Sequence, residues 1–346
     1  MEYQLLPLEP SDTPVLVGLI NAHAMRVVGT RRALVDADGD LRTARYITGA
    51  ATQLVCRTAD GQIAAHVWWI SRPPHVVVEM GQTVHPDYDL TRLGNFLMEE
   101  VETRARSTVG FAPEGACVVL QTTILDADLA AQALLVERGF TRVREWVHFE
   151  LSLGAAPAID LPEGITIRPM DPRFDWPAVG AVMDAAFADH WGEMGPQVRT
   201  LLEEGDAEEI EDEGEDAIED ESEDDPYSNS LGLCFVAEVN GEVIGSCLCN
   251  ARTIEWPDSG KLGSLSVLRP YRRSGVGRAL TAAALAEIYR RGIRRVITDT
   301  DNASFTGANR FYPRFGFRPY RYEHVYEKKL RDGVEWRVLS PDDLVP

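Results

Sequence analysis

The sequence predicts an α/β protein of two tandem domains, each a mixed, mostly antiparallel sheet flanked by helices. The first observation is that the order β-α-β-β-β-α-β-α-β occurs twice along the 346 residues. The second is a tight-hairpin signal in each copy, Asp60-Gly61 and Asn240-Gly241, because these residue types accept positive φ. The third is that each copy ends in a short helix, a Gly-Phe pair and a last strand, with the pairs at Gly139-Phe140 and Gly316-Phe317.

The elements of the two copies correspond one by one. The first copy offers a strand at 3–8, a helix at 13–28, the hairpin LVCRTADGQIAAHVWWI, a strand, turn and helix in VHPDYDLTRLGNFLMEEVETRA, the strand CVVLQTTI and the closing LLVERGFTRVREWVHFELSL. The second copy offers a strand at 165–170, a helix at 176–188, the hairpin CFVAEVNGEVIGSCLC, a strand, turn and helix in VLRPYRRSGVGRALTAAALAEIYRRG, the strand RVITDT and the closing FYPRFGFRPYRYEHVYEKKL. Such self-similarity favours an internal duplication over a single large domain.

The boundary between the copies is predicted from composition. The segment 154–164, GAAPAIDLPEG, has the Ala, Pro and Gly content of a linker. We therefore expect an N-terminal domain over 1–153 and a C-terminal domain over 165–346, in keeping with roughly 100–200 residues per domain.

Charge is concentrated in one insert. Residues 203–225 hold 16 of the 55 acidic residues and no basic residue, so the rest of the chain has 39 acidic against 34 basic side chains. Like charges without apolar periodicity predict a solvated, disordered loop. A docking arm for a basic partner is the alternative. The net charge of −21 disfavours nucleic-acid binding, since it repels phosphate backbones.

No apolar run approaches the ~20 residues of a membrane span, and the N-terminus lacks the basic and apolar parts of a secretion signal. A cytoplasmic protein without membrane contact is expected. The five cysteines are scattered, and no second pair or His couple lies at zinc-site spacing from Cys247 and Cys249. We therefore expect reduced core thiols and no metal.

The segment 262–292 carries the strongest chemical signal. A strand leads into Arg272-Arg273-Ser274-Gly275-Val276-Gly277-Arg278, which opens a helix with a buried stripe at Val276, Leu280, Ala284 and Ile288. Two glycines allow close backbone approach, and free N–H groups at a helix N-terminus attract an anion such as pyrophosphate. The three arginines add positive charge at the same place.

This pattern, Val267-x-x-x-x-Arg272-x-x-Gly275-x-Gly277, resembles motif A of the GNAT (GCN5-related) N-acetyltransferase superfamily. The two-copy plan is similar to tandem GNAT proteins, mycothiol synthase-like proteins among them. The resemblance implies acetyl-CoA bound where two central strands splay apart. It implies that the backbone of Leu265, Ser266 and Val267 pairs with the pantetheine arm, and that the N–H groups from Arg273 to Arg278 hold the pyrophosphate.

Tyr312, four residues before Gly316-Phe317, stands where the family often places a tyrosine that protonates the departing CoA thiolate. A packed tyrosine is the alternative. The position of the family's usual asparagine is Phe305 here, so Asn302 or Asn309 is the candidate cofactor contact.

The general base is left open by the motif. Glu255 lies beside the strand that leads to motif A, and His190 follows the first helix of the second copy, in a region that lines the acceptor side of this fold. A histidine can exchange a proton near neutral pH, although an exposed loop histidine without a catalytic role is the more ordinary interpretation.

The first copy lacks the chemical positions. When Val84 is placed on Val267, Asp89 replaces Arg272 and Arg92 replaces Gly275. When Gly139-Phe140 is placed on Gly316-Phe317, Leu135 replaces Tyr312. An aspartate repels a pyrophosphate, a side chain obstructs close backbone approach, and leucine cannot donate a proton. We expect a degenerate, non-catalytic N-terminal domain.

The sequence thus predicts an acetyl-CoA-dependent N-acetyltransferase that acts on a primary amine, most simply a small molecule, by direct attack in a ternary complex. Two alternatives stay open. One is a non-catalytic acyl-CoA-binding scaffold whose acidic arm at 203–225 recruits a basic partner. The other is a protein acetyltransferase whose acidic loop attracts lysine-rich substrates.

Overall fold

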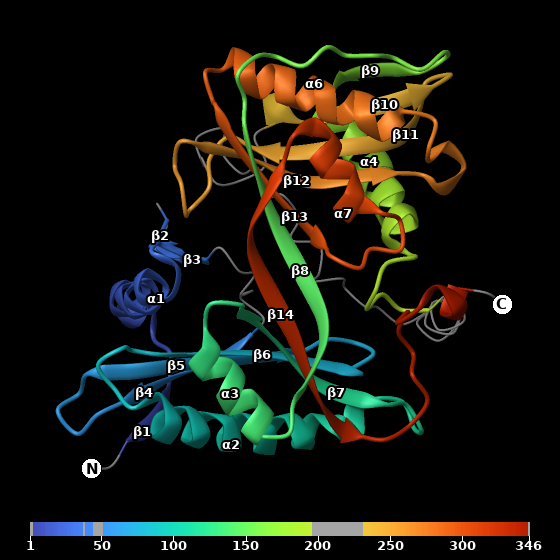
Figure 1. The fold of residues 1–346 in the computed structure, drawn as a ribbon. Coiled ribbons are helices and arrows are strands. Elements are labelled where there is room, and N and C mark those ends of the chain that lie inside the picture. Colours follow the sequence, from blue (N-terminus) through green and yellow to red (C-terminus); the bar gives the residue numbers. More distant parts are fainter. Residues whose placement is uncertain (1–2, 37–38, 44–50, 196–230, 345–346) are drawn as a thin grey trace. The chain divides into compact units, whose positions relative to one another are not determined.

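The structure, a computed structural model, describes residues 3–36, 39–43, 51–195 and 231–344. It divides into two compact units (Figure 1). Unit 1 comprises Met1–Trp146 and Arg321–Trp336, and unit 2 comprises Val147–Tyr320 and Arg337–Pro346. The acidic segment 203–225 lies outside the described residues.

Unit 1 contains a mixed sheet in the order β1-β4-β5-β6-β7-β14 and a separate two-stranded sheet of β2 and β3. Its elements are β1 (Gln4–Pro7), α1 (Thr13–Val28), β2 (Ala33–Val35), β3 (Leu41–Thr43), β4 (Thr52–Arg57), β5 (Ile63–Ser71), β6 (Val77–Val84), α2 (Leu90–Thr108), β7 (Val118–Leu125), α3 (Leu129–Glu137) and most of β14 (Arg318–Arg331). The core gathers residues from β5, β6, β7 and α2, among them Val67, Met80, Leu97 and Leu120.

Unit 2 contains a mixed sheet in the order β8-β13-β12-β11-β10-β9. Its elements are the second half of β8 (Thr141–Ser152), β9 (Thr166–Pro169), α4 (Pro172–Phe187), β10 (Phe235–Val239), β11 (Glu242–Asn250), β12 (Ser259–Val267), α6 (Val276–Arg290), β13 (Arg295–Asp301) and α7 (Ala308–Phe311). Short 3₁₀ turns occur at Pro10–Asp12, Val109–Phe111, Leu231–Leu233, Arg269–Tyr271, Tyr312–Phe315 and Pro341–Leu344.

Each unit takes its last strand from the other copy of the sequence. In unit 1, β14 pairs antiparallel with β7, from Glu323 opposite Leu125 to Arg331 opposite Val118. In unit 2, the end of β8 lies beside β13, where Arg295 donates to Glu150 at 2.7 Å. The units therefore differ from a division into two contiguous segments.

Local sequence explains most element boundaries. Asn240 and Gly241 both have positive φ, 51° and 85°, which closes the β10–β11 hairpin with the twist that neighbouring strands prefer. Helix α4 begins at Pro172, earlier than the expected residue 176, because Asp171 caps it by accepting from the Arg173 N–H at 3.2 Å. The expected stripe of α6 is confirmed, since Val276, Leu280, Ala284 and Ile288 are all buried.

The two faces of the unit 2 sheet are distinguished by their helices. Leu248 of β11 packs with Val179 of α4. Gly245 lies on the opposite face of β11, where a Cβ would be 3.2 Å from Leu280 of α6. Successive strand residues alternate between faces. We call these the α4 face and the α6 face.

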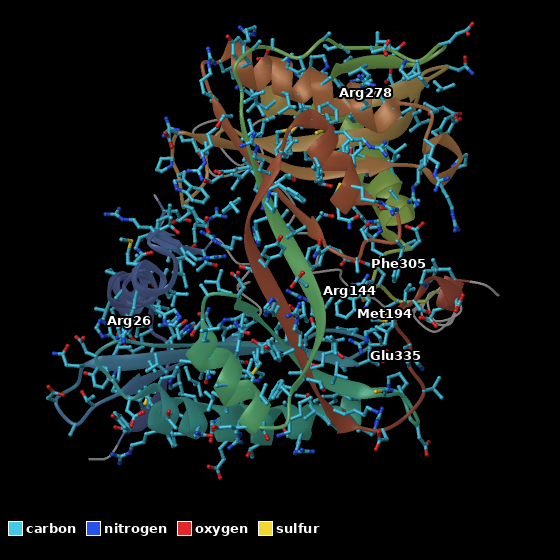
Figure 2. The ribbon with its side chains drawn as sticks, viewed as in Figure 1. Arg26, Arg144, Met194, Arg278, Phe305 and Glu335 are labelled. Atoms are coloured by element: carbon cyan, nitrogen blue, oxygen red, sulfur yellow. The ribbon has the colours of Figure 1, made fainter. Side chains whose placement is uncertain are left out.

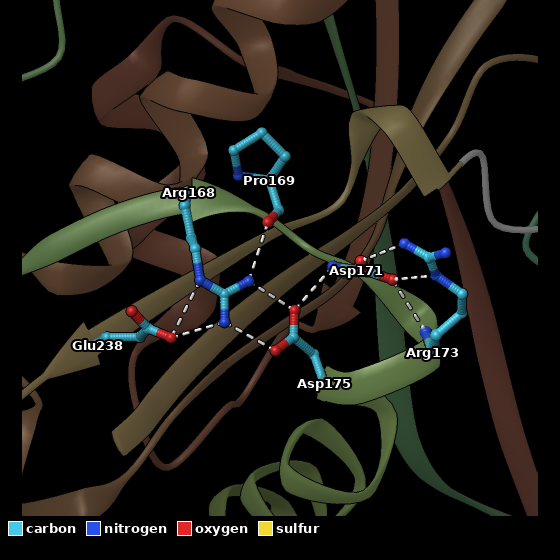
Figure 3. Close-up of polar contacts among 6 residues, drawn as sticks. All are labelled: Arg168, Pro169, Asp171, Arg173, Asp175 and Glu238. Atoms are coloured by element: carbon cyan, nitrogen blue, oxygen red, sulfur yellow. Dashed lines mark hydrogen bonds and ion pairs between the residues drawn. The ribbon is translucent and has the colours of Figure 1, made fainter. Parts of the chain in front are cut away.

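The start of unit 2 is held by an ion network shown in Figure 3. Arg168 of β9 binds both carboxylate oxygens of Asp175 in α4, at 2.6 and 2.7 Å, and also binds Glu238 of β10 at 2.6 Å. Asp175 in turn accepts from the Asp171 N–H at 2.7 Å. One guanidinium thus joins two neighbouring strands to the first turn of α4.

None of the helices in the described ranges is long and apolar enough to span a membrane. All five cysteines are free and buried. Cys234, Cys247 and Cys249 lie together, with 3.8 Å between the sulfurs of the last two, and burial raises the pKa of Cys234 to about 12. In the part of the chain that the structure describes, no group of three or more His, Cys, Asp or Glu residues could hold a metal ion.

Candidate active site

The parallel ladder between β12 and β13 is short. It joins Ser259 to Arg295, Gly260 to Val296 and Lys261 to Ile297, and there it ends. Strand β12 continues to Val267 and remains paired with β11 on its other edge. The stretch from Leu262 to Val267, including the predicted Leu265, Ser266 and Val267, therefore faces β13 without a ladder. We call this opening the strand gap.

The closed end of the strand gap is marked by Thr298 of β13. Its hydroxyl donates to the backbone carbonyl of Leu262 at 3.0 Å, just beyond the last ladder pair. Strand β12 also has a bulge here, because Leu248 and Cys249 of β11 pair with Ser264 and Leu262, which leaves Gly263 as the extra residue. The two strands are thus held together at one point and separate beyond it.

The loop between β12 and α6, residues 268–275, follows the open end of the strand gap. Arg273 and Gly275 both have positive φ, 65° and 95°, and Gly275 is the N-cap of α6 without a side-chain cap. Among the residues that the structure describes, nothing accepts from the backbone N–H groups of 273–278. The Ser274 hydroxyl donates to the Tyr271 carbonyl at 2.6 Å and so stabilises the turn itself. The loop presents unused donors at a helix N-terminus, which suits an anion.

The two glycines of this loop have different surroundings. A Cβ on Gly275 would meet Pro162 at 3.2 Å, in a left-handed conformation that disfavours side chains. A Cβ on Gly277 would meet Val267, Leu265 and Phe311 at ordinary contact distances of 3.7–4.0 Å. Packing therefore does not require glycine at 277, and a side chain there would face Leu265 and Val267 of the strand gap.

The three arginines of the motif have separate roles. Arg273 and Arg278 are exposed, and within the described ranges neither forms an ion pair; Figure 2 shows Arg278 on α6. Arg272 is different, because its guanidinium donates to both oxygens of Asp189, to the Ala186 carbonyl at 2.7 Å and to the Val267 carbonyl at 3.2 Å. It fastens the end of α4 to the end of β12, while Arg273 and Arg278 supply the available charge.

Tyr312 lies in the short turn after α7 and is buried among Phe149, Phe311 and Phe317, with ring centroids 5.3–6.1 Å apart. Burial raises its pKa far above the ordinary value, although a hydrogen bond with Thr298 acts in the opposite direction. The phenol is therefore fully protonated near neutral pH. Through Thr298 it reaches the closed end of the strand gap.

The two asparagines are connected to each other. Asn309 of α7 donates to the backbone carbonyl of Asn302 at 2.6 Å, and Asp301 accepts from the Ala303 N–H at 2.9 Å. These bonds shape the connection between β13 and α7, in which Phe305 also lies (Figure 2). Asn309 thus supports the loop that carries Asn302.

The structure separates the two candidate bases. The ring of His190 lies beside Asp189, with Nδ1 3.3 Å from the carboxylate, and against Phe187 at a centroid distance of 4.9 Å. His190 therefore lies beside the ion pair between Asp189 and Arg272. Glu255 lies in the connection before β12, at the end where β12 and β13 are paired. Its neighbour Trp256 stacks under Arg295, 3.7 Å from the guanidinium to the ring centre.

A candidate site residue that the sequence pattern did not single out is Asp299 of β13. Its carboxylate lies 2.9 Å from the Lys261 ammonium, and each side chain is about one-third exposed. Its negative charge is among the influences that raise the pKa of Tyr312. No motif marks it, because a single carboxylate in an alternating strand is an ordinary feature of a half-exposed sheet.

The helix N-terminus of unit 1 that corresponds to the start of α6 is occupied by the chain's own side chains. Strands β6 and β7 also separate early, after Glu79 and Gln121. However, a Cβ on Gly94, the counterpart of Gly277, would lie 2.7 Å from Leu134. Asp89 caps α2 by accepting from the Arg92 N–H at 3.2 Å. The N-terminus of α2 is thus closed by its own residues.

Comparisons with known proteins find acetyltransferases among the proteins similar to this chain. Residues 196–317 match the model of the acetyltransferase (GNAT) family. The chain is 28% identical over 314 residues to a mycothiol acetyltransferase of Salinispora arenicola, covering 87% of this chain and 92% of that protein.

Two solved structures cover nearly all of this chain. A GCN5-related N-acetyltransferase from Sphaerobacter thermophilus has a TM-score of 0.68 and 25% identity, over 96% of this chain and 97% of that one. A tandem GNAT protein from the clavulanic acid biosynthesis pathway has a TM-score of 0.65 and 17% identity, over 96% and 100%, and shows the same fold. The chain is an acyltransferase whose residues 196–317 match the GNAT acetyltransferases, and its fold is similar to that of tandem GNAT proteins.

Proposed function

We propose that the chain transfers the acetyl group of acetyl-CoA to a primary amine of a small molecule, in a ternary complex within unit 2. The observation that carries this proposal is the strand gap, with unused N–H donors beyond its open end and a protonated phenol beside its closed end. The GNAT family generally uses acetyl-CoA, and the mycothiol acetyltransferases similar to this chain favour a small-molecule acceptor.

Different segments of the chain bind different parts of acetyl-CoA. The N–H groups of 273–278 receive the pyrophosphate, assisted by the exposed side chains of Arg273 and Arg278. The unpaired edge of Leu265, Ser266 and Val267 receives the amide groups of the pantetheine arm, as an added strand would. Asn302 is the candidate for a further contact, and Asn309 keeps its loop in place.

The reaction needs no covalent enzyme intermediate. The neutral amine attacks the thioester carbonyl, a C–N bond forms and the C–S bond breaks. The leaving sulfur takes the phenolic proton of Tyr312, which Thr298 orients by hydrogen bonding. Catalysis arises from holding the two reactants together and from this proton donation. Unit 1 takes no part in the chemistry, because Leu134 packs on Gly94 and Asp89 caps the helix N-terminus that corresponds to the start of α6.

The first test is calorimetric titration of the chain with acetyl-CoA. One site per chain is expected. Gly277→Glu should abolish binding, because it would carry a negatively charged side chain past Leu265 and Val267 into the strand gap, whereas the matched Gly277→Ala should retain it. Substitution of Gly275 is less informative, since strain at its positive φ could disturb the loop by itself.

The second step measures CoA release with three primary amines, namely glucosamine, cysteamine and spermidine. Release with at least one of them, lost in Gly277→Glu, supports the proposed function. Binding of acetyl-CoA without transfer to any of the three would favour a scaffold that binds acyl-CoA. Unchanged binding in Gly277→Glu would refute the location of the site.

A further inference from the structure

Asp299 stands at the point where β12 and β13 separate. The last ladder pair joins Lys261 to Ile297, so Asp299 is the second residue of β13 beyond it. Paired residues of adjacent strands share a face, and residues two apart on a strand do too. Lys261, Ile297 and Asp299 therefore belong to one face, in agreement with the 2.9 Å contact between the Lys261 ammonium and the Asp299 carboxylate.

That face is the α4 face. Asn250 of β11 pairs with Lys261 of β12, and Asn250 shares a face with Leu248, which packs against α4. On the opposite face, Leu262 pairs with Cys249, and a Cβ on Gly260 would lie 3.5 Å from Ile288 of α6. Asp299 and α6 are thus on opposite sides of the sheet.

Tyr312 approaches the strand gap from the α6 face. Its hydrogen-bond partner Thr298 precedes Asp299 on β13 and so points to the opposite face. Consecutive strand residues are only about 3.3 Å apart along the strand. A thioester held in the strand gap would therefore have the phenol on one side and the Asp299 carboxylate at nearly the same level on the other.

Access distinguishes Asp299 from the other carboxylates of this region. Its side chain is 34% exposed, whereas Asp301 and Asp189 are buried. Asp189 is moreover engaged by Arg272, and Asp301 caps the turn at Ala303. A substrate amine can reach Asp299 without displacing a buried side chain.

We propose that Asp299 is the catalytic base that receives the proton of the acceptor amine, and that Lys261 is a positioning residue that holds its carboxylate. This inference rests on the proposed function and adds the residue that the family motif leaves undefined. It also places the acceptor amine on the α4 face of the strand gap, opposite Tyr312.

The proton and electron balance is complete with the groups named. The lone pair of the neutral amine forms the C–N bond, and the nitrogen, now positively charged, loses one proton to Asp299. The electron pair of the C–S bond goes to sulfur, which takes the proton of Tyr312. The products are the acetamide and CoA, and the two side chains then exchange one proton through water. An aspartate suffices because the nitrogen becomes acidic as the C–N bond forms.

Glu255 and His190 are less favourably placed for this step. Glu255 precedes β12 at its paired end, away from the strand gap. His190 lies against Asp189, the partner of Arg272, beside the loop that follows β12. Each remains a useful comparison, because each tests whether another carboxylate or imidazole removes the proton.

The experiment compares the full-length chain with Asp299→Asn, Glu255→Gln and His190→Gln, and with Asp258→Asn as a matched control from the exposed turn before β12. The probe amine is whichever of glucosamine, cysteamine and spermidine the wild type acetylates fastest. We expect kcat of Asp299→Asn to fall about 10²–10⁴-fold, with acetyl-CoA affinity retained in calorimetry. Glu255→Gln, His190→Gln and Asp258→Asn should keep kcat within about threefold, well below the loss that removal of a general base causes.

Two further readouts separate chemistry from folding. Added formate should restore part of the rate of Asp299→Ala, because a small carboxylate can occupy the vacated space. Lys261→Met should lower kcat less than Asp299→Asn, and Lys261→Arg should recover activity. A wild-type rate in Asp299→Asn, or a larger loss in Glu255→Gln or His190→Gln, would overturn the assignment. If the wild type acetylates none of the amines, the proposed function fails and this inference fails with it.

Discussion

Arg272 and Asp189, 83 positions apart in the sequence, form a two-point ion pair. The guanidinium nitrogens lie 2.5 and 3.2 Å from the two carboxylate oxygens. Burial opposes the ionisation of Asp189, but hydrogen bonds from His190 and Arg272 outweigh it and hold its pKa well below the usual range. The first arginine of motif A therefore acts on the protein itself, by fixing the loop that the cofactor is proposed to contact.

Asp189→Asn should loosen this anchor. We expect a loss of about 1–3 kcal/mol in the free energy of unfolding, because the substitution removes the charge partner of a mostly buried guanidinium. The folded-state pKa of Asp189 is depressed, so its contribution is present above the unfolded-state value and is lost as the pH falls through the folded one. The wild-type advantage over the variant should therefore persist at pH 5, as denaturant titration of both proteins would show.

The same variant should bind acetyl-CoA more weakly, since the loop is less ordered before binding. Arg173→Gln serves as the control, because its ion pair with Asp171 is exposed at the other end of α4. Equal stability of Asp189→Asn and the wild type would show that the pair contributes nothing to the anchor.

Alanine at the two corresponding glycines should have effects of opposite sign. At Gly277 the added Cβ has room, so the higher helix propensity should raise the free energy of unfolding by up to about 1 kcal/mol. At Gly94 the Cβ would press on Leu134, and overpacking of this kind costs about 1–3 kcal/mol. Thermal unfolding of the two variants measures the difference. Stabilisation by Gly94→Ala would mean that Leu134 gives way without cost.

Tyr312→Phe should remove the proton donor without altering the aromatic packing around it. We expect kcat to fall by about 10²-fold or more, the usual range for loss of a general acid. The affinity for acetyl-CoA should change little, since the ring itself is kept. Steady-state kinetics with the fastest probe amine tests this, and Tyr320→Phe provides a comparison at a tyrosine that packs on Trp256 instead. An equal loss in both variants would point to general destabilisation.

The stability of unit 1 should depend on pH through His66. Burial lowers the pKa of this histidine from 6.5 to about 3, and its Nε2 pairs with Gln53 at 3.1 Å. Between these values the unfolded chain binds a proton that the folded chain does not, so stability falls as the pH decreases. The slope is about 1.4 kcal/mol per pH unit for a single group.

Urea titrations from pH 4 to 8 on wild type and His66→Gln would measure this contribution. Between pH 4 and 6, the free energy of unfolding of the variant should depend less steeply on pH, by about the slope that one proton causes. Above pH 7 the two curves should run parallel, because the imidazole is neutral in both the folded and the unfolded chain. A slope unchanged by the substitution would mean that His66 is not the group that titrates.

Local signals predicted much of this architecture. The Asn240-Gly241 turn, the glycine loop and the stripe of α6 each depend on a few neighbouring residues whose conformational preferences are strong. Helix α4 starts before the expected residue 176 because the Asp171 cap and Pro172 favour an earlier helix start. The part of the candidate site that a contiguous motif defines, the loop from Arg272 to Arg278, was also predictable from the sequence.

Long-range pairings could not be predicted in this way. Arg272 was expected to face the cofactor, because nothing in its own segment indicates that Asp189 is its partner. Asp299 carries no motif, and only the register of β12 against β13 places it beside the strand gap. The different environments of Gly94 and Gly277 depend on Leu134 in another helix.

The assignment of residues 321–336 to unit 1 affects the order in which the protein can mature during translation. Strand β7 remains unpaired on one edge until β14, its antiparallel neighbour, is synthesised about 200 residues later. A nascent chain that stops at residue 153 therefore exposes an open strand edge, which is a template for wrong pairing. Unit 2, by contrast, receives its β8 segment early and has its last sheet strand once β13 is made. The half proposed to carry the chemistry can thus complete its sheet first, and the half proposed to be inert completes its own only after β14 is made.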